Sequence, residues 1–354
     1  MSDASLTSAH LSPSEYHRHL MTGIVPALRY DGGDVAAWQR RLRRKLRDLL
    51  GYATQPKTPL NARQVWRREH SLGVIEKIIF TSEPYADVPA YVCLPKNARP
   101  PYPFMICLQG HTTGMHVSIG VEREDETKAM DVPGDRDFAL GCMARGIAAL
   151  CIEQRAFGER REQAQQQVSS HGCHDAALQA LLAGKTLIGE RVYDVERGID
   201  YLTTRGDADM RRVGVMGNSG GGTTTIYAAA LLPRLAFAMP SCSFCTFRDS
   251  IGGIYHCADN YVPGILKVAD IADVLGLFAP RPVVVVAGRE DGIFPIGGVR
   301  TAFERLRRIY AAAGAEDACH LVGGEGGHRF YAADAWPVML DAMQGVTTDA
   351  DHRT

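Results

Sequence analysis

The sequence contains no long apolar run and no excess charge of either sign. No stretch approaches the roughly 20 apolar residues that a membrane-spanning helix needs. The formal net charge is −1 over 354 residues, which gives no general electrostatic attraction to nucleic acid or to an anionic membrane surface. Internal repeats and low-complexity linkers are also absent from the sequence. These absences argue against nucleic-acid and membrane partners.

A secretory signal is missing as well, because the first twenty residues lack a positively charged start followed by an apolar run. The nine cysteines are an odd number, and several stand in apolar segments such as YVCL, ICLQ and LCIE. Buried, reduced thiols explain that placement better than a disulfide framework does. We therefore expect a cytoplasmic protein.

Residues 1–64 are expected to form an N-terminal helical extension. The segment DVAAWQRRLRRKLRDLLG predicts a helix with Asp34 as its N-cap and Gly51 at its end. Its apolar residues fall near one face, and the basic run from Arg40 to Arg47 is expected on a solvated face. The helix docks either on its own domain or on a second subunit, in which case the protein is a homo-oligomer.

Residues 65–345 predict one α/β domain, followed by a C-terminal tail at 346–354. The segments HSLGVIEKIIFTS and VPAYVCLP suggest antiparallel strands joined by a turn at EPYAD. Short continuous apolar runs then alternate with helical segments, and such runs are typical of strands buried on both faces of a sheet. Strands alternating with helices imply a mostly parallel sheet with flanking helices. The runs are FMICLQG, IAALCIE, RVGVMGN, LAFAMPS, PVVVVAG and CHLVGG.

One of these runs leads into a G-x-S-x-G motif centred on Ser219. The motif stands between a predicted strand and a predicted helix, which is the context of a nucleophile elbow. Glycines beside the serine leave room for a sharp turn, and the helix that follows directs free N–H groups towards the serine oxygen. A phosphate-binding turn is the alternative, but the segment lacks the lysine of a nucleotide-binding loop.

A serine hydroxyl needs a base, and that base needs an acid to orient it. His328 follows the last predicted strand, and Asp291 follows the strand before it. Both are expected at the carboxyl edge of the sheet, where α/β proteins place their sites. Glu290 is the neighbouring alternative for the acid, and Asp249 or Asp259 could supply it from the preceding loop.

The backbone N–H groups of His111 and Gly220 are the expected oxyanion hole. His111 follows the early strand FMICLQG, and Gly220 follows the serine. Each such donor can contribute about 3–4 kcal/mol at the transition state. The side chains of His111 and His116 either line the pocket or are solvated.

These segments resemble the α/β-hydrolase superfamily, and more narrowly its acetyl xylan esterase-like and dienelactone hydrolase-like branch. The resemblance covers roughly residues 35–342 and rests on the elbow and on four further segments. These are GDRDFALGCMARGIAALCIEQRAFGER, LIGERVYDVERGIDYL, APRPVVVVAGREDGIFP and GEGGHRFY. It implies an α/β-hydrolase fold with Ser219 as nucleophile, His328 as base and Asp291 as acid. Where many relatives read His-Gly after the oxyanion strand, this chain reads Gln109-Gly110.

The predicted function is hydrolysis of a carboxylic ester by a serine enzyme that needs no cofactor. A small acyl group, acetyl first, follows from the family analogy alone. A peptidase or amidase, a lactone hydrolase and a non-catalytic binding protein are the alternatives. Phe244, Tyr255 and Tyr261 are candidate substrate contacts, with ordinary packing as the alternative.

No metal site is expected from the sequence. Cys242 and Cys245 form a C-x-x-C motif, and His256 and Cys257 follow shortly after. However, no second pair stands at the spacing of a structural zinc site. The segment HGCHD at 171–175 is a candidate rim of the pocket, and its two histidines are expected to be solvated or structural.

Overall fold

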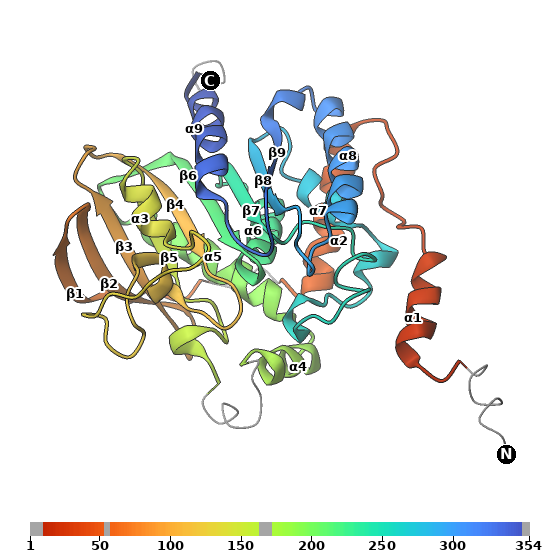
Figure 1. Ribbon diagram of the computed structural model, residues 1–354, viewed down its shortest axis with the longest axis horizontal. Helices are drawn as coiled ribbons and strands as arrows, with labels where there is room; N and C mark the ends of the chain where they lie inside the picture. Colours follow the sequence, from red (N-terminus) through yellow and green to blue (C-terminus); the bar gives the residue numbers. More distant parts are fainter. Residues whose placement is uncertain (1–9, 53–56, 163–171, 349–354) are drawn as a thin grey trace.

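The computed structural model describes residues 10–52, 57–162 and 172–348. Its centre is a nine-stranded sheet with the order β1-β2-β3-β5-β4-β6-β7-β8-β9 (Figure 1). The strands are β1 (Arg63–His70), β2 (Gly73–Glu83), β3 (Ala86–Pro95), β4 (Tyr102–Leu108), β5 (Ala148–Ile152), β6 (Ala208–Asn218), β7 (Phe237–Ser241), β8 (Val283–Gly288) and β9 (Cys319–Gly324). All six predicted apolar runs are strands of this sheet.

The pairing of the strands changes from antiparallel to parallel at β5. Strands β1, β2 and β3 are antiparallel neighbours, and the predicted turn closes between Glu83 and Ala86. Strand β3 is antiparallel to β5, whereas β5, β4, β6, β7, β8 and β9 are mutually parallel. The carboxyl ends of these parallel strands therefore meet at one edge.

Helices cover both faces of the sheet. In chain order, the described helices are α1 (Pro13–Thr22), α2 (Val35–Leu50), α3 (Phe138–Met143), α4 (His174–Leu182), α5 (Leu187–Thr203), α6 (Gly220–Leu231), α7 (Ile271–Gly276), α8 (Ile296–Ala312) and α9 (Ala332–Thr348). Short 3₁₀ helices are η2 (Met115–Ile119), η3 (Gly158–Arg160), η4 (Ala258–Asn260), η5 (Ile265–Lys267) and η6 (Glu316–Ala318). Helix α9 thus extends into the segment 346–354 that the sequence predicts as a tail.

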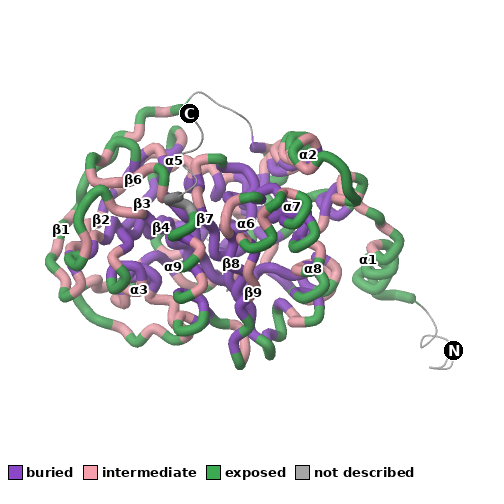
Figure 2. The backbone as a smooth tube through the Cα atoms, turned by 90° about the horizontal axis from the view of Figure 1, so that it is seen from above, coloured by how far each residue is buried: buried purple, intermediate pink, exposed green. Residues whose placement is uncertain are grey.

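Two hydrophobic cores lie on opposite faces of the sheet, and the buried strands contribute to both. In β8, Val283 and Val285 belong to the larger core, which contains residues of α2, α5, α6, α7 and α8. Val284 and Val286 belong to the other core, together with residues of α3 and α9. This alternation is why the strand is an unbroken apolar run, and the strands appear buried through the middle of the molecule (Figure 2).

Helix α2 has the predicted ends and docks on its own domain. The carboxylate of Asp34 accepts a hydrogen bond from Ala37 N–H, and Gly51 ends the helix in a left-handed conformation. Leu42, Leu46 and Leu50 are fully buried in the larger core.

The basic face of α2 differs from the prediction at Arg43. Its guanidinium donates to the carbonyls of Ala230 at 3.0 Å and Leu277 at 2.8 Å. Arg43 is therefore partly buried and caps neighbouring helical carbonyls, while Arg40, Arg41 and Arg44 are exposed as predicted.

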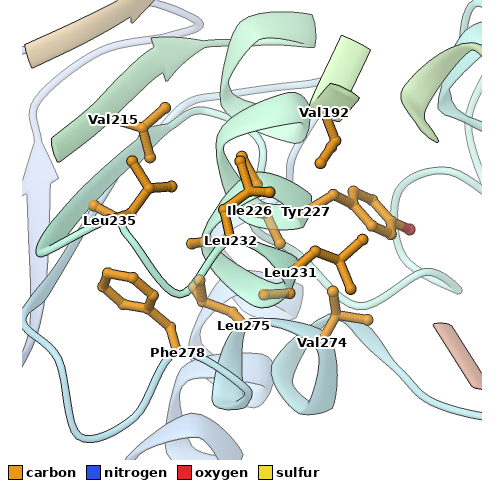
Figure 3. Packing of buried hydrophobic residues seen from close by; sticks show 14 of the residues in the cluster. Val192, Val215, Ile226, Tyr227, Leu231, Leu232, Leu235, Val274, Leu275 and Phe278 are labelled. Carbon is orange, nitrogen blue, oxygen red and sulfur yellow. The ribbon is translucent and has the colours of Figure 1, made fainter. Parts of the chain in front are cut away.

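Helix α6, which follows the elbow, is buried on all sides. Figure 3 shows Ile226, Tyr227 and Leu231 of this helix among side chains of β6, α5 and α7. A helix packed in this way holds its first turn rigidly against the end of β6. By contrast, α1 has no buried residue and extends from the body of the protein (Figure 1). No described helix combines the length and the apolar character needed to cross a membrane.

Candidate active site

Ser219 occupies the sharp turn between β6 and α6. Its backbone has φ 57° and ψ −123°, a combination that L-residues rarely adopt and that costs on the order of 1–3 kcal/mol. Ser219 N–H donates to the Ser241 carbonyl at 2.9 Å. The neighbouring Asn218 accepts a hydrogen bond from the Ser241 hydroxyl at 2.8 Å, so its polar side chain anchors the turn to β7.

The glycines of the motif are required by close packing. A methyl group on Gly217 would lie 2.5 Å from the Gly221 carbonyl carbon, and one on Gly221 would lie 2.1 Å from the Leu108 oxygen. Both distances are far below van der Waals contact, so any larger residue would displace backbone. The prediction that glycines leave room for a sharp turn beside the serine is confirmed, because a side chain at Gly217 or Gly221 would collide with the backbone.

Asp291 and His328 form a hydrogen-bonded pair at the ends of β8 and β9. His328 Nδ1 lies 2.8 Å from Asp291 Oδ2, while Asp291 Oδ1 accepts the N–H groups of Ile293 at 2.8 Å and Phe294 at 3.1 Å. Burial raises the pKa of Asp291, but His328 and these two amides outweigh it, so the pKa lies below its ordinary value. Asp291 is therefore a buried carboxylate aimed at the histidine.

The three alternative acids lie in other environments. Glu290 is exposed. Asp249 accepts a hydrogen bond from the Thr246 hydroxyl, and Asp259 pairs with His111 and Arg191. Among the candidate acids, Asp291 is the one that is hydrogen-bonded to His328.

The second ring nitrogen of His328 is available for chemistry. Nε2 is buried and has no hydrogen-bond partner among the described residues. The ring stacks on Phe294, with centroids 5.9 Å apart and planes at 15°. Since Nδ1 is engaged by Asp291, Nε2 is the atom that can accept a proton.

The loop after β4 passes directly beside the elbow. A methyl group on Gly110 would lie 3.0 Å from Ser219 Cβ, and one on Gly220 would lie 2.8 Å from His111 Nδ1. The two residues predicted to form the oxyanion hole, His111 and Gly220, are thus neighbours. That their amides bind an oxyanion stays a prediction.

Gln109 links the end of β4 to three neighbouring segments through hydrogen bonds. Its amide nitrogen donates to the Ser118 hydroxyl at 2.8 Å and to the Arg136 carbonyl at 2.7 Å. The backbone carbonyl of Gln109 accepts a hydrogen bond from the side-chain amide of Gln154 at 2.5 Å. These bonds tie the end of β4 to its surroundings.

The side chain of His111 belongs to a buried ionic cluster. Its Nε2 lies 2.8 Å from Asp259 Oδ1, and Arg191 Nη1 donates to Asp259 Oδ2 at 2.5 Å. Burial lowers the pKa of His111, but the Asp259 carboxylate outweighs burial and raises the pKa to about 9. From the sequence, Asp259 was only an alternative acid for the triad, and no motif indicated that Arg191 belongs to the site.

Glu153 is a further buried group that the sequence did not indicate. Its carboxylate accepts the N–H groups of Met115 and Glu159, each at 3.1 Å. Burial raises the pKa of Glu153 to about 7. Through Met115 it holds the loop that continues from His111, so it positions that loop.

The three predicted substrate contacts lie in different environments. Phe244 is 1% exposed and belongs to the larger core, where packing accounts for it. Tyr255 is 77% exposed. Tyr261 is 45% exposed and lines an apolar cavity of about 210 Å³ with Met21 and Phe247. None of the described contacts links these three side chains to Ser219.

The remaining histidines and the C-x-x-C motif do not form one cluster. His116 Nδ1 is buried, and burial lowers the pKa of this side chain. Cys242 donates to the Arg329 carbonyl and Cys245 to the Pro295 carbonyl. In the segment 171–175, His174 is exposed and pairs with Asp175, whereas His171 lies outside the described residues.

A family model described as the Abhydrolase family matches residues 27–322. The chain belongs to this family. A curated relative is YtaP of Bacillus subtilis (strain 168), assigned as a hydrolase, with 26% identity over 81% of this chain and 92% of that protein. The expected α/β-hydrolase fold and the assignment to the hydrolases are therefore confirmed.

Two solved structures share the fold. A protein of Bacteroides fragilis NCTC 9343 assigned as an acetyl xylan esterase has a TM-score of 0.73 at 17% identity, over 89% of this chain and 83% of its own. A glucuronoyl esterase from Solibacter usitatus has a TM-score of 0.66 at 16% identity, over 89% and 94% of the two chains. At these identities the likeness is one of fold, and it agrees with the predicted acetyl xylan esterase-like branch.

Proposed function

We propose that the protein hydrolyses carboxylic esters through an acyl-enzyme formed on Ser219. The observation that carries the proposal is the hydrogen bond between Asp291 and His328 at the sheet edge where the strained Ser219 stands. Membership of a hydrolase family supports the reaction class. A serine, a histidine and an oriented carboxylate are the groups that acyl transfer requires.

In this mechanism His328 Nε2 takes the hydroxyl proton as Ser219 Oγ attacks the ester carbonyl carbon. The carboxylate of Asp291 keeps the proton of the neutral ring on Nδ1 and stabilises the imidazolium that forms. The alcohol leaves with a proton from His328. Water then attacks the acyl-enzyme with the same proton transfers, which returns the serine and releases the acid.

The negative oxygen of each tetrahedral intermediate is assigned to the amides of His111 and Gly220. The His111 ring lies close to Gly220, the residue after the serine, and this proximity supports the pairing. The first turn of α6 adds its positive dipole end.

A small acyl group, acetyl first, is the proposed substrate class. The fold shared with the protein assigned as an acetyl xylan esterase supports this choice. Eight of the nine cysteines are buried, which supports the expected cytoplasmic location. The absence of nucleic-acid and membrane partners remains part of the same proposal, whereas α2 no longer supports a homo-oligomer because it docks on its own domain.

The experiment is turnover of p-nitrophenyl esters from acetyl to longer acyl chains by wild type and Ser219→Ala. We expect wild-type kcat/KM to fall with acyl length and the variant to be inactive. Ser71→Ala, an exposed serine between β1 and β2, is the control and should keep full activity. A phosphonate ester should add one covalent group to Ser219.

Equal turnover by Ser219→Ala would contradict the proposal. Labelling of Ser219 without turnover of any ester would contradict the ester class and favour amides or lactones. If Ser219 is not labelled and no ester is turned over, the result would favour a non-catalytic binding protein.

A further inference from the structure

Four metal-binding side chains converge beside the elbow, although they are distant in the sequence. His111 follows β4, Cys173 precedes α4, and Cys257 and Asp259 stand at η4. One ligand atom from each lies within 4.8 Å of every other. Cys173 and Asp259 are almost completely buried. The fold has therefore gathered one imidazole, two thiols and one carboxylate at a single interior point.

We propose that this cluster binds one Zn²⁺ ion. Thiolate, imidazole and carboxylate are the three ligand types that zinc takes in proteins, and four protein ligands make a closed, tetrahedral, structural site. Thiolates select against Mg²⁺ and Ca²⁺, which prefer oxygen ligands. The cluster contains none of Ser219, Asp291 and His328, although the backbone amide of His111 is the proposed oxyanion donor, and the zinc proposal does not depend on the proposed hydrolysis.

The contacts of Asp259 fit such an ion. Asp259 Oδ2 stays with Arg191, whose guanidinium also donates to the Arg155 carbonyl and lies over the Phe157 ring. Asp259 Oδ1 faces His111 Nε2 at 2.8 Å. An ion between these two atoms would replace the proton that they now share, so a small separation of the ring and the carboxylate is sufficient.

The charges of the cluster also balance around a divalent cation. Two thiolates and one carboxylate are negative, whereas Zn²⁺ and the Arg191 guanidinium supply the same amount of positive charge. Because an uncompensated charge is costly in an interior position, this neutrality favours a divalent ion. Arg191 acts as a neighbour that orients the ligand carboxylate.

Zinc at this point would fix the loop that carries the proposed oxyanion donor. It would join the loop after β4, the N-terminal end of α4 and the 3₁₀ helix η4. With Nε2 bound to metal, the ring proton of His111 must be on Nδ1, the atom beside Gly220. The sequence predicts no metal here because the ligands come from three separate segments.

Metal content and spectroscopy test the proposal on the full chain, reduced and stripped with a chelator. Equilibrium dialysis against Zn²⁺ should give about one equivalent per chain. Co²⁺ in place of Zn²⁺ should give the visible bands of tetrahedral cobalt and a near-ultraviolet thiolate-to-metal band. In Cys173→Ser/Cys257→Ser, the thiolate band should disappear and affinity should fall at least about 100-fold.

Cys242→Ser is the matched control, because Cys242, Asp291 and His328 form a second group of metal-type side chains among the described residues. It should keep the cobalt spectrum. A second measurement needs no substitution, since added Zn²⁺ should raise the melting temperature of the stripped wild type. Wild type that binds well under one equivalent, or a thiolate band lost in Cys242→Ser and retained in the double variant, overturns the proposal.

Discussion

Asp291 holds His328 with one carboxylate oxygen and two backbone amides with the other. Oδ2 lies 2.8 Å from His328 Nδ1, and Oδ1 accepts N–H groups from Ile293 and Phe294. The acid cannot rotate without losing one of these bonds. The orientation of the imidazole is thereby built into the loop after β8.

Asp291→Asn should reduce kcat on p-nitrophenyl acetate by roughly 10⁴-fold, because an amide no longer enforces the required tautomer. Thermal stability should change much less than activity. Glu290→Gln is the control and should behave as wild type, since Glu290 is exposed. The reverse pattern would assign the acid to Glu290.

Gly221→Ala should destabilise the protein by several kcal/mol, since its methyl group would lie 2.1 Å from the Leu108 oxygen. The measurement is urea unfolding followed by circular dichroism. Gly297→Ala is the matched helical control: nothing lies within 4 Å of its new methyl group, so stability should stay constant or rise by up to about 1 kcal/mol. Similar losses in both variants would contradict the packing at the elbow.

Glu153→Gln should change how stability depends on pH. Burial raises the folded-state pKa of Glu153 from 4.5 to about 7, so folded wild type retains a proton that the unfolded chain releases. Wild type therefore loses stability as pH rises from about 4.5 to about 7, by on the order of 3 kcal/mol, and glutamine does not titrate.

The measurement for Glu153 is the free energy of unfolding of both proteins between pH 4.5 and 8. The advantage of the glutamine variant should grow through this window and then become constant. Glu304→Gln, at an exposed position of α8, should run parallel to wild type. A difference that shrinks as pH rises would refute the raised pKa.

Leu46→Ala tests whether α2 belongs to the hydrolase core. Leu46 is fully buried in the larger core, so its truncation should cost about 2–5 kcal/mol. Unfolding should remain a single transition. Lys45→Ala, on the exposed face, should stay within about 0.5 kcal/mol. Two separate transitions, or an unchanged stability, would make α2 an independent extension.

Local signals made the sheet and the helix ends predictable. The run PVVVVAG is unbroken because alternate valines enter opposite cores. Asp34 and Gly51 cap helix α2 through contacts with nearby backbone groups, so the ends of this helix can be predicted from local sequence alone. The same holds for the elbow, whose crowding follows from a strand that passes straight into a helix.

The surroundings of the site were not predictable, because they depend on segments far apart in the chain. Arg191 and Asp259 are 68 residues apart and meet only once α5 and η4 are placed. Phe244 was a candidate substrate contact with ordinary packing as the alternative, and its burial among other side chains decides for packing. Arg43 reads as one charge of a basic face, yet two carbonyls of other helices turn it inward.

The strained backbone of Ser219 sets a trade-off between the stability of the fold and the proposed activity. Glycine would relax the left-handed conformation at this position and should raise the free energy of unfolding by on the order of 1 kcal/mol. The same change removes the hydroxyl. Mutation that is screened only for thermal resistance will therefore tend to remove this hydroxyl, which is the proposed nucleophile, whereas screening for the proposed hydrolysis should retain Ser219.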